Sequence, residues 1–456
     1  MHSVIRPPRI GPNVFRLAWR DRALRLVLVV ALVIRAALAI AALDRGSAEA
    51  SDTHTYLEPA QSLLAHARFD SDDAPELSRT PGYSLLLIVG ELTGHTFPTT
   101  LALHVILSTA TTFGVAVLAL AMGCTRRVAT VAAAVYALEP TGLIYVSKLL
   151  TETLFTAATT GLLIAITLWA RDDGRMHLFV AAALLAVAAL VRPVAYYAPL
   201  PAALLIVFIA YRYHHTPMRA AVLVGAMFFA ISGAPLAAWR VRNAMVAGYD
   251  RFTAIGDIHL LYFRAAGVIA RQSGRTLETV QAQLRRELDV DAPLVATERI
   301  ARGRERAARY REMRRRGVAV IDKAPVAVAL DVAAGAARIM LGRETSEWGV
   351  LLGLESLSRS WRIVRVVLTI AWLPLLLLAL VGLVRGRWQI PIVLPGLLLT
   401  AYLVVLSSGP ESSSRFRLAF IPFLSVLIAA GAVHMTRRGA DSLAERQPLA
   451  GGAVSR

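Results

Sequence analysis

Apolar residues in this chain of 456 residues gather into long runs separated by short polar segments. Crossing a hydrocarbon layer of about 30 Å takes about 20 residues of helix, so each run is a candidate membrane span. The pattern predicts ten spans. They cover residues 24–43, 98–122, 127–147, 149–170, 177–191, 194–210, 219–239, 363–384, 390–407 and 416–435.

Two of the ten predicted spans contain residues that interrupt helices. Glu139-Pro140 lies within 127–147, and the run 177–191 is short and followed by Arg192-Pro193. Proline removes a backbone donor and clashes with the preceding turn. We therefore expect both helices to break near the outer membrane surface.

Two shorter apolar segments lie outside the ten predicted spans. Residues 84–93 follow Pro81-Gly82, and we expect them at the membrane interface or in a re-entrant hairpin. Residues 326–341 predict a helix that rests on the membrane surface, with Asp331 and Arg338 on its polar side.

The composition agrees with an integral membrane protein. Apolar residues make up 56% of the chain, and the mean hydropathy is +0.56. The 49 Lys and Arg against 31 Asp and Glu give a net charge of +18, but the basic residues fall in loops and no nucleic-acid motif accompanies them. The partners expected from charge are therefore membrane lipids and not nucleic acid. The single cysteine, Cys124, excludes an internal disulfide.

Basic residues in the short loops predict the orientation of the chain. The Arg-rich first 22 residues and the apolar run after them could be a secretory signal peptide. The run 24–43 is longer than a signal core, however, and more spans follow, so we favour an uncleaved first span. With that end inside, alternate loops carry the cytoplasmic arginines that the positive-inside rule requires. These are Arg126 and Arg127, Arg171 and Arg175, Arg212 and Arg219, Arg385 and Arg387, and Arg437 and Arg438.

This orientation places both termini in the cytoplasm and both long loops outside, and it predicts four regions. An N-terminal membrane module, residues 1–240, contains the first extracytoplasmic loop, 44–97. A second extracytoplasmic loop with interfacial helices covers 241–362. The last transmembrane helices occupy 363–436, and a cytoplasmic tail covers 437–456.

The first outer loop is acidic and contains a short helical pattern. Asp52, Tyr56, Leu63 and Leu64 follow helical spacing, which predicts an amphipathic helix over 52–66 capped by Ser51 or Asp52. From spacing alone, a cap in a solvated loop is the favoured interpretation of Asp52, and a functional carboxylate is the alternative.

Several motifs now occur in an order that resembles a known superfamily. Asp52-x-x-x-Tyr56 and Arg79-x-Pro81-Gly82-Tyr83 lie in the first outer loop. The pattern continues at Pro140 with Glu152, Arg192-Pro193, Arg242-Asn243 followed by Gly248, and Arg415-Phe416-Arg417 with Pro422. This arrangement resembles the GT-C glycosyltransferases, in particular the branch of protein O-mannosyltransferases, lipid A aminoarabinose transferases and related bacterial enzymes that use polyprenyl-phosphate sugars.

The resemblance implies an all-α polytopic fold, a GT-C-like bundle of about ten transmembrane helices with extracytoplasmic loop helices. It also implies transfer of a sugar from a polyprenyl-phosphate donor to an acceptor hydroxyl, with inversion. Asp52 matches the catalytic aspartate of the family and would act as general base. Arginines suit the leaving phosphate, and the expected donor-phosphate residues are Arg79, Arg242, Arg415 and Arg417.

Other polar residues are candidates for lining or positioning in the cavity. They are Tyr56, Tyr83, Glu139, Lys148, Glu152, Arg192 and Asn243. Structural alternatives remain open for several candidates. Arg79 could be an interfacial anchor, and Arg192 could be a snorkelling side chain. For Lys148 and Glu152, an ion pair at helical spacing is favoured.

No cofactor is predicted, and a divalent metal is left open because some relatives use one. His54 and His259 are possible ligands, but a lone histidine is more often a polar loop residue. The basic stretch 298–317 favours a solvated helix with ion pairs; attraction to anionic lipids or an acidic acceptor is the alternative. The resemblance implies that this loop covers the site and shapes acceptor choice.

The expected function is therefore a membrane glycosyltransferase with a protein, lipid or glycan acceptor. The Ala- and Arg-rich composition suggests a bacterial inner membrane. Two other classes remain as alternatives: a transporter or flippase of polyprenyl-linked sugars, which would need a polar path through the midplane, and a non-catalytic assembly subunit.

Overall fold

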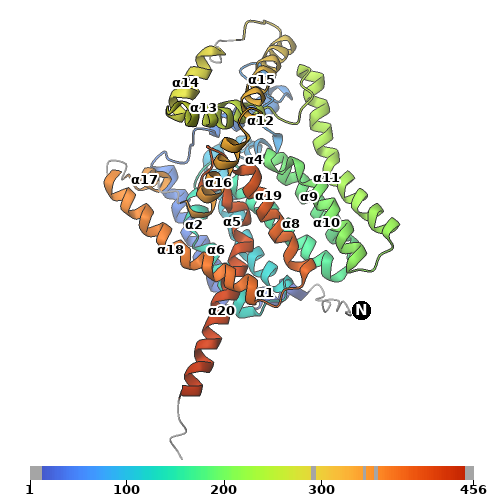
Figure 1. Cartoon of the computed structure of the whole chain (residues 1–456), viewed down its shortest axis with the longest axis vertical. Helices are drawn as coiled ribbons and strands as arrows, with labels where there is room; N and C mark the ends of the chain where they lie inside the picture. Colours follow the sequence, from blue (N-terminus) through green and yellow to red (C-terminus); the bar gives the residue numbers. More distant parts are fainter. Residues whose placement is uncertain (1–12, 289–293, 343–345, 354–357, 447–456) are drawn as a thin grey trace, which may run out of the picture.

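Helices form nearly all of the computed structural model, which describes residues 13–288, 294–342, 346–353 and 358–446. Within these residues a single two-stranded hairpin, β1 (Asp70–Ser71) and β2 (Ala74–Pro75), is the only sheet. Long helices run through the lower body of the molecule, and shorter ones gather above them (Figure 1). The predicted all-α class is confirmed.

The described part of the chain has seven helical segments long and apolar enough to cross a membrane, and nine if two bent helix pairs each count as one span. The helices that carry the seven are α2 (Arg22–Asp44), α5 (Thr96–Ala121), α8 (Glu152–Asp172), α11 (Met218–Ala247), α18 (Ser358–Arg385), α19 (Ile390–Ser407) and α20 (Ile421–Arg446). The last segment begins in the 3₁₀ turn η3 (Ser414–Phe420).

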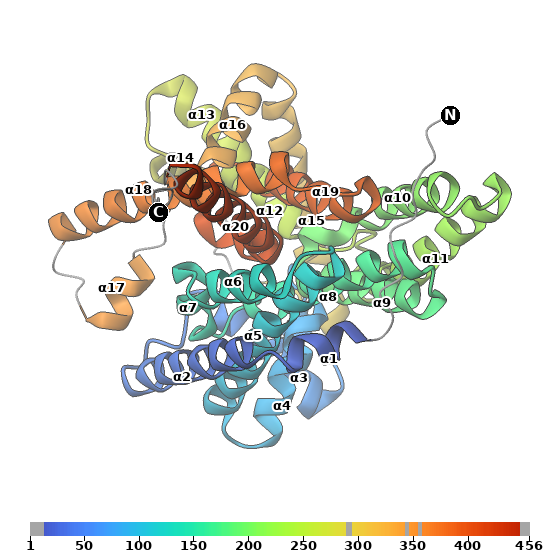
Figure 2. The ribbon, with the colours of Figure 1, turned by 90° about the horizontal axis from the view of Figure 1, so that it is seen from below.

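The core of the bundle lies where α5, α8 and α20 meet the shorter helix α6 (Arg126–Ala137). Seen from below, α6 and α8 lie in the middle of the bundle, with α2 on one side and α19 and α20 on the other (Figure 2). Side chains from these helices form the largest buried apolar cluster. Small residues on α6, such as Ala129, Ala132 and Ala133, are buried there and allow close packing.

All ten predicted spans are helical, but two of them are too short to cross a bilayer unaided. The predicted spans 177–191 and 194–210 correspond to α9 (Arg175–Val191), with 17 residues, and α10 (Pro199–Arg212), with 14. Between them Arg192-Pro193 ends α9, and a 3₁₀ turn, η1 (Pro193–Tyr197), replaces the first turn of the predicted span. Counting each as a full span was therefore an overestimate, because proline shortens both helices.

The predicted break at Glu139-Pro140 is confirmed. The helix α6 ends at Ala137, and α7 (Pro140–Val146) continues at an angle of 58°. Arg35, fully buried in the middle of α2, donates to the carbonyl oxygen of Ala137 at 3.2 Å and to the hydroxyl of Ser108 at 2.7 Å. A cation at a helix C-terminus satisfies a carbonyl and complements the helix dipole, so Arg35 stabilises the broken span.

The shorter elements form a polar cap at one end of the bundle. Those from the first outer loop are α3 (Thr53–His66), the β1–β2 hairpin and α4 (Pro81–Leu92). Those from the second are α12 (Ile255–His259), the π-helical segment η2 (Leu260–Ala265), α13 (Ala266–Ser273), α14 (Leu277–Glu287), α15 (Arg299–Ile321), α16 (Pro325–Leu341) and α17 (Ser346–Leu352). The apolar segments predicted at 84–93 and 326–341 are the helices α4 and α16.

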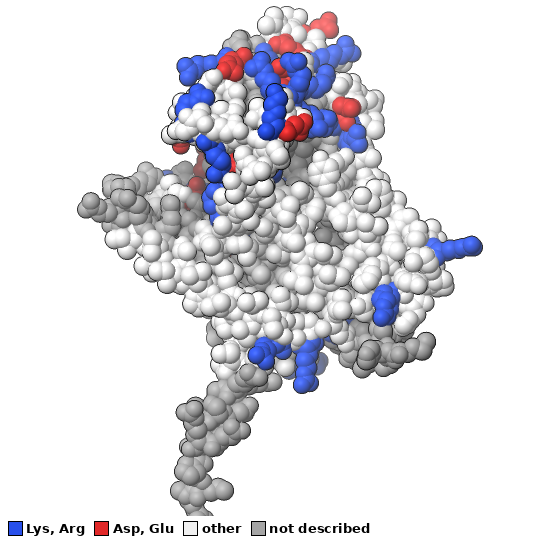
Figure 3. All heavy atoms as spheres, viewed as in Figure 1, with Lys and Arg blue, Asp and Glu red and all other residues white. Residues whose placement is uncertain are grey.

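Charged side chains divide the visible surface into three zones. Figure 3 shows Lys, Arg, Asp and Glu crowded on the cap, a broad uncharged area over most of the bundle, and a few basic side chains at the right edge and at the opposite end. An uncharged belt between polar ends is what a bilayer requires of a multi-pass protein. The division fits the predicted orientation, in which the cap faces outward and the basic end faces the cytoplasm; that orientation remains a prediction.

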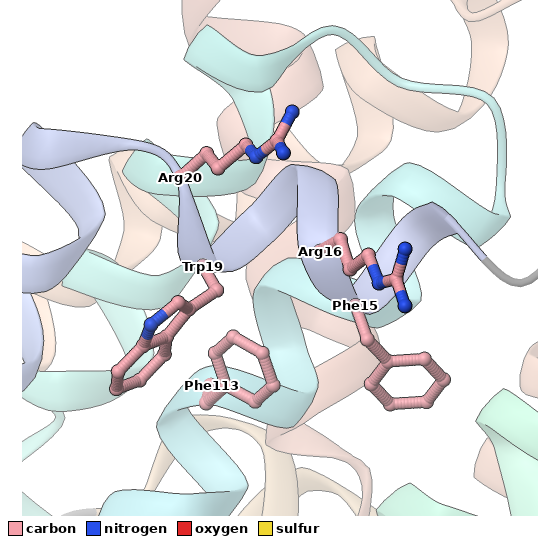
Figure 4. A pocket seen from close by; sticks show the side chains of 5 residues that line it. All are labelled: Phe15, Arg16, Trp19, Arg20 and Phe113. Atoms are coloured by element: carbon pink, nitrogen blue, oxygen red, sulfur yellow. The ribbon is translucent and has the colours of Figure 1, made fainter.

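At the end opposite the cap, the first helix, α1 (Asn13–Trp19), packs against α5. Phe15 and Trp19 lie on either side of Phe113 from α5, and the guanidinium groups of Arg16 and Arg20 lie apart from the three rings (Figure 4). Trp19 is 60% exposed. Aromatic rings beside arginines are typical of a membrane interface, so we interpret α1 as an interfacial anchor.

We predict that Arg35→Met destabilises the protein, because Ala137 and Ser108 each lose a buried partner, at a cost of about 1–3 kcal/mol per unsatisfied group. The measurement is the apparent melting temperature of the purified protein in detergent. Arg25→Met changes an exposed arginine on the same helix and serves as the control. Equal melting temperatures for the two variants would contradict a stabilising role for Arg35.

Candidate active site

The helix α3 presents three polar side chains on one face. Asp52 is its N-cap residue, but the Asp52 side chain makes no capping hydrogen bond. Thr55 and Tyr56 follow at helical spacings of three and four residues, which place them beside Asp52. The capping interpretation of Asp52 therefore does not account for its carboxylate.

Arg79 binds all three of these side chains. Its Nη2 donates to Asp52 Oδ1 at 3.0 Å, its Nε donates to the Thr55 hydroxyl at 2.9 Å, and its Nη1 donates to the Tyr56 hydroxyl at 3.1 Å. The guanidinium carbon also lies 4.6 Å from the centre of the Tyr56 ring. Burial acts to lower the pKa of Arg79, but Tyr56, Asp52 and Glu76 outweigh it, so the pKa is raised and the guanidinium stays charged.

Tyr83 packs against Tyr56. The two rings meet edge to face with centres 5.3 Å apart, and the Tyr83 hydroxyl contacts His104 Nε2 at 3.3 Å. Both tyrosines are buried, and burial raises the pKa of Tyr56, so its hydroxyl remains neutral. Tyr83 thus supports the site and does not line it.

A second group of charges comes from three other parts of the chain. Glu152, the first residue of α8, accepts a hydrogen bond from Arg192 at 3.0 Å and lies 3.9 Å from Arg415 Nε. Both arginines contact the Phe416 ring, whose centre lies 5.4 Å from the Arg192 guanidinium carbon and 5.2 Å from that of Arg415. Glu152 is only 3% exposed, so the two arginines are the partners that offset the desolvation of its carboxylate.

The two groups lie near enough to influence each other electrostatically. Arg192 and Glu152 contribute to the electrostatic environment of Tyr56, and Asp52 and Tyr56 contribute to that of Arg415. The two groups together contain three guanidinium groups and two carboxylates, and Glu76 lies behind Arg79 as a further, buried carboxylate. The Asp52 and Arg415 side chains are 36% and 31% exposed, so solvent reaches both. Such a site can bind a phosphate and hold a carboxylate beside it.

Glu76 fixes the backbone that carries Arg79. Its Oε1 accepts hydrogen bonds from the backbone N–H groups of Ser78 and Arg79 and from the Ser78 hydroxyl, and its Oε2 accepts from the Ser71 hydroxyl. The residue is 5% exposed. A buried carboxylate with this many donors holds a turn firmly, because charge-assisted hydrogen bonds are about twice as strong as neutral ones.

The basic helix α15 holds the β1–β2 hairpin that precedes this turn. Arg299 binds Asp70, and Arg306 donates to Ser71 and to the carbonyl oxygen of Pro75. Arg306 also lies 3.9 Å from Glu76. The favoured prediction of a solvated helix with internal ion pairs holds for Arg309–Glu305 and Arg316–Glu312. It missed the contacts of Arg299 and Arg306 with the hairpin, because those partners lie about 230 residues earlier in the chain.

Arg242 and Asn243 lie in the same scaffold and outside the charged cluster. Arg242 donates to the carbonyl oxygens of Glu76 and Phe69 at 2.7 and 2.6 Å, and Asn243 donates to those of Arg251 and Phe252. The structure therefore ties Arg242 to the hairpin instead of leaving it open to a phosphate.

Arg417 and Glu139 also form a structural pair. Arg417 is fully buried and donates to Glu139, Thr141 and the carbonyl oxygen of Gly342, while Glu139 caps α7 by accepting from Gly142. The expected phosphate role of Arg417 and cavity role of Glu139 do not agree with this burial. Of the two arginines in the Arg415-Phe416-Arg417 motif, only Arg415 belongs to the site.

The favoured Lys148–Glu152 ion pair is wrong. Lys148 is buried, binds Glu347 at 2.8 Å and donates to the carbonyl oxygen of Ser47, whereas Glu152 binds Arg192. Residues 148–151 form a turn before α8 begins, so the helical spacing that the pairing assumed does not exist there. Lys148 holds the start of the first outer loop.

Metal ligands do not converge in the described part of the chain. No group of three or more His, Cys, Asp or Glu side chains could hold an ion there. His259 instead contacts Glu411 at 3.6 Å. The arginines around Asp52 and Glu152 supply positive charge where a metal would otherwise do so, so this donor set does not fit a divalent ion.

The described structure is similar in fold to solved membrane glycosyltransferases. An oligosaccharyltransferase, AglB from Archaeoglobus fulgidus, solved with an inhibitory peptide and a dolichol-phosphate, matches at 13% identity over 97% of this chain and 53% of its own, with a TM-score of 0.51. The apo form of the A. fulgidus enzyme matches with the same score and 14% identity over 95% of this chain and 53% of its own.

ArnT from Cupriavidus metallidurans bound to undecaprenyl phosphate gives a TM-score of 0.40 at 14% identity, over 93% of this chain and 80% of its own. The chain spans about half the length of the archaeal enzyme. No protein-family model and no curated protein matches the sequence. The archaeal comparison shows that this chain shares the fold of that oligosaccharyltransferase.

We predict that Glu76→Gln loosens the turn before Arg79, because a neutral amide accepts weaker hydrogen bonds than a carboxylate. Hydrogen–deuterium exchange of peptides covering residues 69–80 should be faster by roughly tenfold. Glu58→Gln on the neighbouring helix α3 is the control. Unchanged exchange in the Glu76 variant would show that this carboxylate does not organise the loop.

Proposed function

We propose that the protein is a membrane glycosyltransferase that moves a sugar from a polyprenyl-phosphate donor to an acceptor hydroxyl at the extracytoplasmic face. The observation that carries the proposal is the solvent-accessible Asp52–Arg79 ion pair, which shares its electrostatic environment with the cluster of Glu152, Arg192 and Arg415. The donor lipid would remain in the bilayer while its phosphate reaches the site between the bundle and the cap.

Asp52 is the proposed general base. Arg79 holds Oδ1, while Oδ2 has no protein partner within the described residues. An acceptor hydroxyl that binds Oδ2 would give up its proton to Asp52 as its oxygen bonds to the anomeric carbon. The bond from that carbon to the phosphate oxygen then breaks, and the phosphate leaves with the electron pair. Attack from the opposite side predicts inversion.

Arg79 and Arg415 are the proposed ligands of the leaving phosphate, and Arg192 is a supporting cation of the same cluster. Arg415 is only loosely engaged by Glu152, at 3.9 Å, and has guanidinium donors available. A phosphate that draws Arg79 toward itself would weaken the Asp52–Arg79 pair and make Asp52 a stronger base at the moment it is needed. The same donors would stabilise the negative charge that develops on the phosphate.

The fold supports a donor of this kind. AglB, which shares the fold, was solved with a dolichol-phosphate, a polyprenyl phosphate in the broad sense. We infer a multi-pass protein of a bacterial inner membrane with the polar cap outside. The acceptor, whether protein, lipid or glycan, would approach from the cap, where the second loop overlies the first.

The alternative of a transporter or flippase is less well supported. Such a protein needs a polar path across the bilayer. In Figure 3 the charged side chains gather at the cap and are missing from most of the bundle on the visible face. The buried Arg35 is engaged by carbonyl and hydroxyl groups of neighbouring helices, so it supports a helix break and not a pathway.

We predict that Asp52→Asn lowers sugar transfer by about 10² to 10⁴, the usual contribution of a positioned general base. Donor binding should change little, because the phosphate contacts arginines. The assay is release of polyprenyl phosphate from the purified protein. Glu49→Gln, an exposed change in the same loop, is the control. A fully active Asp52→Asn variant would remove Asp52 from the mechanism.

We predict that Arg415→Gln weakens donor binding by about tenfold, the loss expected from one charge-assisted hydrogen bond to phosphate. Titration of the purified protein with a polyprenyl-phosphate sugar measures the effect. Arg240→Gln is the matched control, because Arg240 binds the carbonyl oxygen of Asp250. Equal donor affinity for the two variants would contradict a phosphate role for Arg415.

A further inference from the structure

A second positively charged site lies in the cap, separate from the charged cluster around Asp52. It is an open depression of about 430 Å³ where α13 packs against α16, next to the loop that follows α19. The α13–α16 depression is lined by Arg271, Arg275, Leu277, Asp331, Arg338 and Pro410. None of these residues takes part in the proposed reaction.

The three arginines of the depression are oriented by the protein. Arg275 donates to Gln283 at 2.6 Å and to the Ser273 hydroxyl at 3.1 Å, and Arg338 donates to the carbonyl oxygen of Gly409 at 2.7 Å. Arg271 binds Asp331. A guanidinium has five N–H donors, so each keeps several for a ligand. Arginines fixed in this way lose less entropy when they bind an anion.

The charges of the depression do not balance. Asp331 is its one carboxylate, so three arginines against one aspartate leave a net charge of +2. Two further carboxylates directly follow lining residues in the chain, Glu278 after Leu277 and Glu411 after Pro410. Neither lines the depression, and Glu411 is engaged by His259. A site with this excess favours a ligand with one or two negative charges.

The position of the depression limits the source of that ligand. Helix α19 is a predicted membrane span that ends at Ser407, and Pro410 follows three residues later. Residues just beyond the end of a span lie at the level of lipid headgroups. Leu277 and Pro410 add apolar surface beside the arginines. Phosphate is the anion expected at this level, and arginine binds it through paired donors.

We propose that the α13–α16 depression is a binding site for a phosphate ester, carried either by an anionic phospholipid headgroup or by a soluble phosphorylated molecule. The site goes beyond the proposed transferase function, since it holds its ligand whether or not sugar transfer occurs. Through Arg338 and Gly409 it adjoins the loop that leads to Arg415, so an occupied site would brace that loop.

The test is native mass spectrometry of the full-length protein in detergent, titrated with phosphatidylglycerol and, separately, with glycerol 1-phosphate. We expect Arg275→Gln to weaken binding by about tenfold, while Arg275→Lys, which keeps the charge, retains most of it. Arg275 is exposed and contacts only Ser273 and Gln283, so its replacement should leave the fold intact. Arg304→Gln, an exposed change on α15, is the control.

The two ligands separate the possible sources. Binding of phosphatidylglycerol that glycerol 1-phosphate does not displace would identify a lipid site, and displacement would identify a site for the phosphate ester itself. Failure of both ligands to bind, or equal affinity in the Arg275→Gln and Arg304→Gln variants, would overturn the proposal. Because the readout is binding, a lack of transferase activity would not affect it.

Discussion

The contact between Arg79 and the polar face of α3 is the interaction on which the rest of the site depends. One guanidinium holds Asp52, Thr55 and Tyr56 together, and it does so only because Glu76 fixes the turn that carries Arg79. Glu76 in turn directly follows a hairpin that α15 and Arg242 hold in place. The geometry of a carboxylate in residues 44–97 is thus set by arginines of residues 241–362.

This dependence explains the distribution of charge in the protein. The cap uses many of its arginines to join segments distant in sequence, and only a few remain available to a ligand. Buried ion pairs stabilise weakly, because desolvation offsets their attraction, but each pair allows only one arrangement of its partners. Such pairs suit a site that must keep its shape beside a fluid membrane. The arginines at the end opposite the cap, by contrast, have only to lie at the membrane interface.

The sequence predicted the fold well, because apolar runs and prolines act locally. The break at Pro140 and the helix after Asp52 could both be read from neighbouring residues. The sequence could not show which arginines bind other parts of the protein and which are open to a ligand. Arg242 and Arg417 share the outer location of Arg79 and Arg415, and only the three-dimensional contacts show that they bind carbonyl groups. Glu76 was missed as well, because an acidic loop gives no sign of which carboxylate is buried.

Incubation of the purified protein with a panel of polyprenyl-phosphate sugars, followed by measurement of released polyprenyl phosphate, tests the central claim most directly. The account predicts that at least one sugar donor is consumed and that the new glycosidic bond has the inverted configuration. Binding of these donors without release of polyprenyl phosphate, in the presence of peptide, lipid and glycan acceptors, would contradict it and leave the charged cluster as a binding site alone.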